Sequence, residues 1–295
     1  MGAKGVCVVT ATPASRMGLM SFFSVPAATL DLDVSNEENS RYFAPVAGMK
    51  VTIVGSGDAF SSGGRAHTCI RIDAAAATVV VDFGSGAMTA WQKLGFDTND
   101  IDAIIVSHLH GDHFGGIPAL LLHAQFVAGR SKPLLIVGPP GLKVRLQEML
   151  DLFFPGSTTV AWNYAWQVRE IGGSRKITVA GLTLETFDVI HSPGSMPTGI
   201  RLSDGKHVFA YSGDTAWTET LNAIAAGADL FLCECSSGDE PVPNHLHWAQ
   251  LKGKLKGFAA KRIAITHMGP SAIAKIPEMQ AAGLIVANDG LSLDL

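Results

Sequence analysis

Short runs rich in Val, Ile and Thr recur along the chain from residue 50 onward, and turns containing Gly or Pro separate them. β-Branched side chains pack well on the pleated surface of a sheet, so these runs predict β-strands. The predicted strands cover residues 51–54, 68–72, 78–82, 103–106, 134–137, 176–179, 182–189, 208–212, 230–233 and 262–266.

Several segments between these strands have the spacing of amphipathic helices. The clearest apolar stripe runs from Ile117 to Ala128. Further helices are expected at residues 87–94, 142–152, 218–226, 248–258 and 273–282. Two similar halves, each with strands inside and helices outside, predict an α/β protein with a four-layer αββα sandwich and a functional site at the strand ends.

Residues 1–48 read differently and contain a short apolar patch, residues 17–30. We interpret them as an extension of unclear role, loosely attached or upstream of a natural start near Met49, and residues 49–295 as the folded domain. A signal peptide is the alternative interpretation. It would require a longer apolar core and a clearer cleavage site than Ala27-Ala28 provides.

The composition fits an α/β enzyme and excludes a mostly disordered chain, with 47% hydrophobic residues, 16% charged residues and 32 glycines. No uninterrupted apolar segment approaches the roughly 20 residues that a bilayer span requires, so we expect a soluble protein without a membrane partner. The net charge of -4 provides no basic field for a nucleic-acid backbone, which makes nucleic acid an unfavourable partner.

The four cysteines, Cys7, Cys69, Cys233 and Cys235, have neither the density nor the spacing of a disulfide framework or a zinc knuckle. Their number and spacing are typical of a protein in a reducing cytoplasm, which is the compartment that we expect.

One dense polar motif directly follows the apolar run 104–106. It places His108, His110, Asp112 and His113 within six positions, with a turn-forming glycine between them. Imidazole nitrogens and carboxylate oxygens are good ligands for zinc and similar divalent ions. The motif therefore predicts a metal site, and the alternative is a polar surface loop that happens to be rich in histidine.

The spacing of these four residues divides them into two pairs. His108 and His110 are two positions apart at the end of an extended segment, so their side chains point to the same side and can bind one ion. Asp112 and His113 follow Gly111 and can turn toward a second ion beside the first.

The motif His-x-His-x-Asp-His after an apolar strand resembles the signature of the metallo-β-lactamase superfamily of binuclear metal hydrolases. Three more chemistry-bearing residues follow predicted strands in the second half of the chain: His191, Asp214 and His267. Each has a structural alternative, since Asp214 could cap a helix and either histidine could be satisfied by local hydrogen bonds.

The resemblance implies a division of these residues between two divalent ions, which are zinc, with manganese as the alternative. The first ion takes His108, His110 and His191, the second takes Asp112, His113 and His267, and Asp214 bridges both. Two such ions about 3.5 to 4 Å apart hold a shared water and lower its pKa, so that a bridging hydroxide becomes the nucleophile. We expect Asp112 to take part in catalysis as well as to bind the metal.

Other stretches resemble the RNase Z-like branch of the superfamily, namely residues 54–60, 64–69, 211–215, 233–236 and 244–246. In that branch a glutamate and a downstream histidine assist catalysis, and the matching residues are Glu234 and His245. A protonated His245 could donate to the leaving oxygen or hold a phosphate oxygen, with Glu234 orienting it. The alternative is that both residues are ordinary parts of a strand end and a helix entry.

The basic arm that RNase Z proteins use for transfer RNA has no counterpart at residues 156–173, which contain only Arg169 as a basic residue. We therefore expect a hydrolase of a small phosphodiester, such as a cyclic nucleotide or cyclic sugar phosphate. The alternatives are a carboxylic-ester, lactone or sulfate-ester hydrolase, a tRNA 3′-processing endonuclease, a mono-iron oxygenase and a non-enzymatic binding protein. A homodimer is expected from the resemblance alone.

Overall fold

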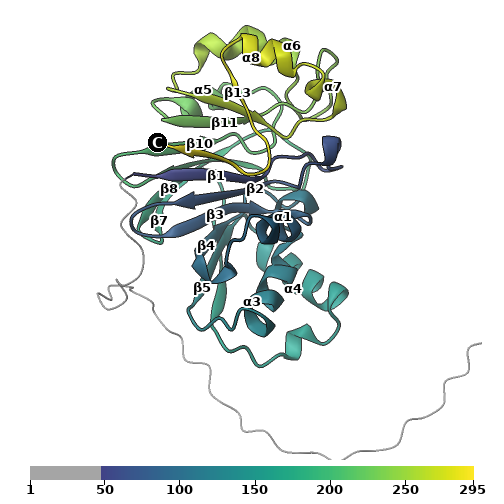
Figure 1. Cartoon of the computed structure of the whole chain (residues 1–295), viewed down its shortest axis with the longest axis vertical. Helices are drawn as coiled ribbons and strands as arrows, with labels where there is room; N and C mark the ends of the chain where they lie inside the picture. Colours follow the sequence, from purple (N-terminus) through teal and green to yellow (C-terminus); the bar gives the residue numbers. More distant parts are fainter. Residues whose placement is uncertain (1–47) are drawn as a thin grey trace, which may run out of the picture. The chain divides into compact units, whose positions relative to one another are not determined.

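Two seven-stranded β-sheets lie face to face at the centre of the computed structural model, which describes residues 48–295 (Figure 1). The expected extension, residues 1–48, lies outside the described residues apart from Gly48.

The first sheet has the order β14-β1-β2-β3-β4-β5-β6. Its strands at the β14 end pair antiparallel, and the pairs from β3 to β6 are parallel. The strands are β1 (Lys50–Gly55), β2 (Cys69–Asp73), β3 (Thr78–Phe83), β4 (Ile101–Ile105), β5 (Leu134–Gly138), β6 (Trp166–Glu170) and β14 (Leu291–Asp294).

The second sheet has the order β13-β12-β11-β10-β9-β8-β7. The pairs from β13 to β10 are parallel, and the remaining pairs are antiparallel. The strands are β7 (Arg175–Val179), β8 (Leu182–Asp188), β9 (Thr198–Ser203), β10 (Val208–Tyr211), β11 (Leu230–Glu234), β12 (Ile263–Thr266) and β13 (Ile285–Val286).

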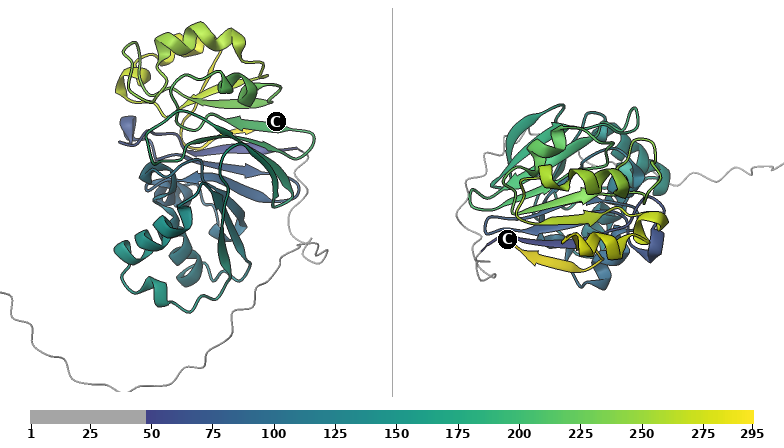
Figure 2. Two further views of the ribbon diagram at one scale, coloured as in Figure 1. Left: turned by 180° about the vertical axis from the view of Figure 1, so that it is seen from behind. Right: turned by 90° about the horizontal axis from the view of Figure 1, so that it is seen from above.

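Helices cover the outer face of each sheet (Figures 1 and 2). The first sheet packs against α1 (Ala87–Lys93), α3 (Ile117–Phe126) and α4 (Leu142–Phe153), and the short α2 (Gly111–Phe114) follows β4. The second sheet packs against α5 (Thr220–Ala225), α6 (Trp248–Lys254), α7 (Pro270–Ile273) and α8 (Ile276–Ala281).

Three apolar layers hold this arrangement together. The central layer joins the sheets and includes Val51 and Ile53 of β1 and Leu230 and Leu232 of β11. The other two layers lie between each sheet and its helices. Strands β3, β5, β10 and β11 are largely buried on both faces, so nearly every position along them is apolar. The four-layer αββα sandwich expected from the sequence is confirmed.

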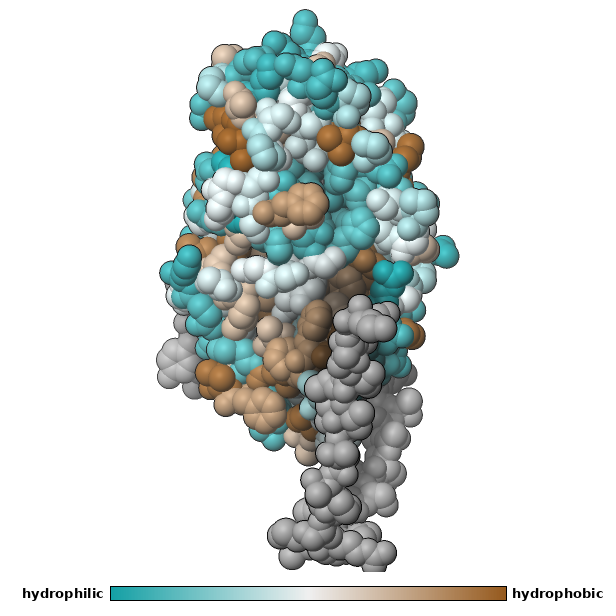
Figure 3. Space-filling view, turned by 90° about the vertical axis from the view of Figure 1, so that its right-hand side faces the viewer, coloured by the Kyte–Doolittle hydropathy of each residue, from teal (hydrophilic) through white to brown (hydrophobic). Residues whose placement is uncertain are grey.

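Helix α4 shows how the outer layers are built. Leu142, Leu146 and Leu150 recur every four residues and are buried, while Leu152 and Phe153 are exposed near the end of the helix. On the face shown in Figure 3, apolar side chains gather in the lower part of the view. The helix thus contributes to the core with one stripe and leaves apolar side chains on the outer surface.

The structure differs from the sequence predictions in one helix and in four strands. The single helix expected at residues 273–282 is divided into α7 and α8, because Pro277 has no N–H and its ring would clash with the carbonyl four residues earlier. The segment 156–173 contains β6, which pairs parallel with β5. The strands β9, β13 and β14 had also not been predicted.

No helix among residues 48–295 has both the length and the apolar content that a membrane span requires.

Candidate metal centre

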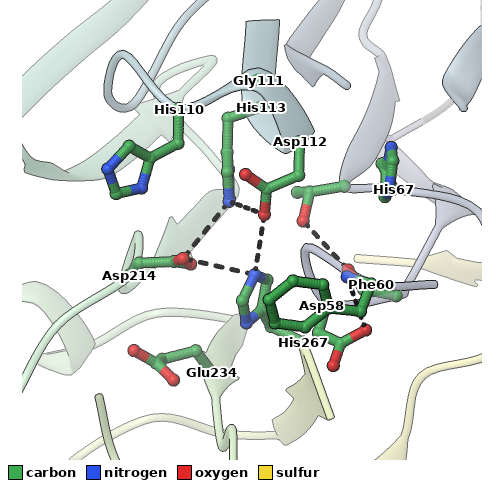
Figure 4. A network of polar contacts seen from close by, with 12 residues as sticks. Asp58, Phe60, His67, His110, Gly111, Asp112, His113, Asp214, Glu234 and His267 are labelled. Carbon is green, nitrogen blue, oxygen red and sulfur yellow. Dashed lines mark hydrogen bonds and ion pairs between the residues drawn. The ribbon is translucent and has the colours of Figure 1, made fainter. Parts of the chain in front are cut away.

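The first four candidate ligands lie at the end of β4 and in the short helix after it. His108 follows the strand in a loop, and His110 immediately precedes α2. Asp112 and His113 lie within α2, and their side chains point into the site (Figure 4). The turn at Gly111 therefore places the two pairs side by side, as the spacing indicated.

The other three candidates follow strands of the second sheet. His191 comes after β8, Asp214 comes after β10, and His267 directly follows β12. The backbone N–H of His267 donates to Ser56 O at the end of β1 (3.1 Å), which joins the ends of the two sheets at this point. Strand ends from both halves of the fold therefore supply side chains to one place.

The first cluster consists of His108, His110 and His191, whose candidate ligand nitrogens all lie within 4.8 Å of one another. His110 Nδ1 lies 3.2 Å from His108 Nε2 and 3.1 Å from His191 Nε2. These three nitrogens converge, as ligands of a common ion do.

The second cluster consists of Asp112, His113, Asp214 and His267, all buried and also within 4.8 Å. Asp112 Oδ2 lies 3.2 Å from both His113 Nε2 and His267 Nε2. The cluster combines two carboxylates with two imidazoles, a donor set that suits a divalent transition metal.

Asp214 lies between the two clusters. Its Oδ2 is 3.3 Å from His113 Nε2 and 3.2 Å from His267 Nε2. The same oxygen is 3.8 Å from His108 Nε2 and 3.9 Å from His191 Nε2. One carboxylate oxygen therefore approaches two histidines of each cluster, which is the arrangement that a bridging ligand requires.

Two observations show that these residues fit a pair of ions. His113 Nε2 and Asp214 Oδ1 are buried but have no hydrogen-bond partner among residues 48–295, which is costly unless another group binds them. Burial opposes ionisation of Asp112 and Asp214, but the nearby His113 and His267 outweigh it and hold the pKa of both carboxyls below its ordinary value. Both carboxyls therefore remain ionised beside these positive charges, and a bound cation would act on them in the same direction.

The ring orientation of three histidines is fixed from outside the clusters. His191 Nδ1 donates to Asn244 O (2.9 Å), and His113 Nδ1 donates to Asp82 Oδ2 (2.7 Å). His108 Nδ1 lies 3.0 Å from Ser107 Oγ. In each case the Nδ1 contact leaves Nε2 facing the cluster, the usual arrangement of a metal-ligating histidine.

Asp82 is the functional residue that the sequence analysis missed. Its carboxylate also accepts hydrogen bonds from Ser107 N and Ser107 Oγ, both at 2.7 Å, so it supports the loop that carries His108. The β2–β3 register shifts beside Asp82, which has the left-handed φ of 58°. The signal in the sequence was a lone carboxylate in an apolar strand, directly before Phe83 and Gly84.

Gly213 allows Asp214 to take its position. It has a φ of 60°, and a Cβ at this residue would lie 2.5 Å from the carbonyl oxygen of Thr198. A side chain would therefore push the turn away from β9 and displace Asp214 from the clusters.

Glu234 and His245 form a pair beside the metal clusters. His245 Nδ1 lies 3.0 Å from Glu234 Oε1, which also accepts from Thr215 N at 2.6 Å. Burial would lower the pKa of His245, but the hydrogen bond and charge of Glu234 outweigh it and raise that pKa. The His245 ring stacks at 5.6 Å from His267 and lies 4.7 Å from His191. All nine sequence-predicted site residues are thus brought to one place.

Comparisons with known proteins agree with this arrangement. The family model described as anti-Pycsar protein Apyc1 matches residues 49–289. The uncharacterized protein Rv1339 of Mycobacterium tuberculosis is 30% identical over 200 residues, which cover 65% of this chain and 70% of Rv1339. A ribonuclease Z of Mycobacterium sp. (strain KMS) is 26% identical over 191 residues, which cover 61% of this chain and 66% of that protein.

The fold is also that of a solved structure. The metallo-β-lactamase fold protein YhfI from Bacillus subtilis superposes with a TM-score of 0.69 at 20% sequence identity, covering 84% of this chain and 99% of YhfI. The metallo-β-lactamase fold that the resemblance implied is confirmed, and the His/Asp clusters form a candidate site for divalent metal ions. The chain belongs to the anti-Pycsar protein Apyc1 family and has the metallo-β-lactamase fold.

Proposed function

We propose that residues 49–295 form a binuclear metal-dependent hydrolase that acts on a small phosphodiester. The observation that carries this proposal is the position of Asp214 Oδ2, within 3.9 Å of histidines from both clusters. A single carboxylate shared by two ligand groups is typical of a two-metal hydrolytic site.

Under this proposal His108, His110 and His191 hold one ion, Asp112, His113 and His267 hold the second, and Asp214 holds both. The ions are zinc, with manganese as the alternative. When bound, such a pair supplies a water of lowered pKa and Lewis acidity toward the phosphoryl oxygen. Burial of His108 and of the four residues of the second cluster excludes bulk water around these groups and strengthens their electrostatic interactions.

His245 acts on the substrate in this scheme. Its raised pKa keeps the imidazole protonated over a wider pH range, and the Glu234 carboxylate fixes Nδ1, so Nε2–H is free to point toward the substrate. We assign to His245 the donation of a proton to the leaving oxygen. Glu234 is completely buried and serves as the positioning residue for His245.

Two observations support a small phosphodiester as the substrate. One of the relatives is a ribonuclease Z, a name that denotes cleavage of phosphodiester bonds in RNA. Residues 156–173 contain only one basic residue, Arg169, and form β6 and short turns, so they provide no basic arm for a large polyanion. Cyclic nucleotides and cyclic sugar phosphates require the same hydrolysis without such an arm.

A substrate panel on zinc- or manganese-loaded protein tests the proposal. We expect turnover of bis(p-nitrophenyl) phosphate and of cyclic phosphodiesters, and turnover at background level for p-nitrophenyl carboxylic esters, lactones and sulfates. Efficient lactone or carboxylic-ester hydrolysis with no diester cleavage would instead establish the alternative ester-hydrolase function on the same site.

A further inference from the structure

Asn244 lies next to two residues of the candidate metal centre to which we assign different roles. Its backbone carbonyl oxygen accepts a hydrogen bond from Nδ1 of the candidate ligand His191 (2.9 Å). The next residue along the chain is His245, to which we assign proton donation. One short turn therefore contacts a metal ligand through its backbone and also carries the proton donor.

The loop that contains this turn, residues 235–247, connects β11 with α6 and is closed at its base. Ser236 N donates to Leu246 O (2.9 Å), and Trp248 N donates to Ser237 O (2.9 Å). Because both ends of the loop are joined in this way, the turn has a defined position relative to the end of β11.

Residues 242–245 form a turn whose geometry restricts the residue at position 244. His245 N donates to Val242 O at 3.3 Å, Pro243 occupies the second position, and Asn244 has the left-handed φ of 64° at the third position. These are the features of a type II β-turn, in which proline is favoured at the second position and a positive φ restricts the third position to glycine or asparagine. Asn244 therefore fits the backbone conformation that this turn requires.

The turn contacts His191 in two ways. The Asn244 carbonyl binds Nδ1, and the His245 ring packs edge-on against the His191 ring, with 4.7 Å between the ring centroids and 74° between the ring planes. One nitrogen each of His191 and His245 and one oxygen of Asp214 lie within 4.8 Å of one another. A shift of the turn would therefore change the orientation of His191 and the position of His245 together.

We propose that Asn244 is a positioning residue that couples binding of the first ion, through His191, to proton donation by His245. Its left-handed backbone, and not its side chain, carries this role. The inference rests on the proposed function. A residue that resists the left-handed conformation should weaken binding of the first ion and slow turnover at the same time.

The test compares Asn244→Val with the conservative variant Asn244→Gly. Valine is β-branched and resists a positive φ. Asn244→Val should lower the affinity of one of the two metal sites about 10- to 100-fold, the usual effect of disturbing a partner that orients a ligand. It should also lower kcat by up to about 100-fold, the effect of a misplacement of about 1 Å.

Asn244→Gly should rescue both quantities, because glycine adopts a positive φ freely. Titration against a chelating dye gives the affinity of each metal site, and turnover of bis(p-nitrophenyl) phosphate at saturating metal gives kcat. Should Asn244→Val not fold, Asn244→Ala takes its place and should show the same two losses at a smaller size.

Ala180→Val is the matched control. Ala180 also has a left-handed φ, of 47°, but it lies in the turn between β7 and β8. This variant should lose stability in chemical denaturation and keep the metal affinities and the kcat of the wild type.

Wild-type metal affinity in the folded Val or Ala variant at position 244 would overturn the inference, and so would an equal loss of affinity in Asn244→Gly. Either result would leave the proposed function standing, provided that the wild type cleaves the diester. Metal-loaded wild-type protein that cleaves no diester would refute the proposed function and the coupling with it.

Discussion

At the scale of single residues, the orientation of the candidate ligands depends on side chains that are not ligands. Asp82 connects both clusters, because it binds His113 directly and reaches His108 through Ser107 Oγ. A ligand ring that can rotate loses part of its affinity for metal. The metal centre should therefore be sensitive to Asp82 although this residue contacts neither ion.

Replacing Asp82 by Asn should lower metal affinity about 10- to 100-fold, the usual effect of losing a partner that orients a ligand. Asn also tolerates a positive φ, so the substitution avoids the backbone strain that Ala would add at this position. Metal affinity is measured by competition with a chromophoric chelator. The control is Asp97→Asn, which alters a carboxylate that caps the short turn before β4; equal affinities of the two variants would contradict the role assigned to Asp82.

Replacing His245 should affect turnover without affecting metal binding. His245→Ala should keep both ions, because His245 is outside the assigned ligand set, and lower kcat about 100- to 10,000-fold, as expected for loss of a general acid. Metal content by elemental analysis and steady-state kinetics measure the two effects. Added imidazole should restore part of the rate. A variant with full kcat, or one that loses an ion, would show that His245 does not have the proposed role.

At the scale of elements, the site depends on turns that bring the ends of neighbouring strands together. The turn after β10 approaches β9 so closely that only glycine fits at position 213. Asp214 follows Gly213 in the same turn. A substitution at Gly213 would therefore also move the carboxylate that lies between the two clusters.

Gly213→Ala should destabilise the fold and reduce metal content, because the new Cβ would meet the Thr198 carbonyl. Gly227→Ala is the matched control: Gly227 has a φ of 67°, but a Cβ there would meet no atom of the described residues within 4 Å. The control should lose only the roughly 1–2 kcal/mol of a left-handed non-glycine residue. Chemical denaturation measures the stability of the two variants, and metal analysis measures their metal content. Similar losses of both in the two variants would argue against the clash with Thr198.

The sequence predicted most of the interior strands because they are rich in apolar and β-branched residues and are buried on both faces. It did not predict β9, β13 and β14, since β13 has two residues and the others carry polar residues or glycine within short runs. Such strands form because a neighbouring strand offers hydrogen bonds, a condition that no local pattern records. The same holds for β6, whose residues are largely exposed.

Most of the candidate site was also predictable from the sequence. The His-x-His-x-Asp-His motif is dense enough to indicate metal, and residues that follow buried parallel strands meet at one edge of a sheet. Asp82 was not predicted because its position depends on a shift in the β2–β3 register. Such a shift has no periodic signature in the sequence.

At the scale of the whole described chain, each cluster takes residues from both halves of the fold. His108 and His110 come from the first half and are joined by His191 from the second; Asp112 and His113 are likewise joined by Asp214 and His267. Bound ions would therefore tie the two halves together and stabilise the native state, because the unfolded chain offers no preformed site.

Removing the ions with EDTA should lower the Tm by about 5 to 10 °C, the shift expected when ligand binding contributes about 2.7 kcal/mol to a domain of this size. Differential scanning calorimetry measures the change. Asp214→Ala should have a low Tm that EDTA does not alter, since it has already lost the shared ligand. An unchanged wild-type Tm after verified removal of metal would mean that the ions do not link the two halves.

Because β14 pairs with β1, the order of the strands and helices along the chain could be changed by circular permutation. Leu295 N donates to Met49 O at 2.8 Å, and the two strands run antiparallel, so the last residue lies next to the first residue of the patterned domain. A two-residue hairpin could connect them. If the chain were reopened at Gly172-Gly173, between β6 and β7, a circularly permuted protein would carry His191, Asp214 and His267 before the His-x-His-x-Asp-His motif in its sequence, yet would retain every strand neighbour.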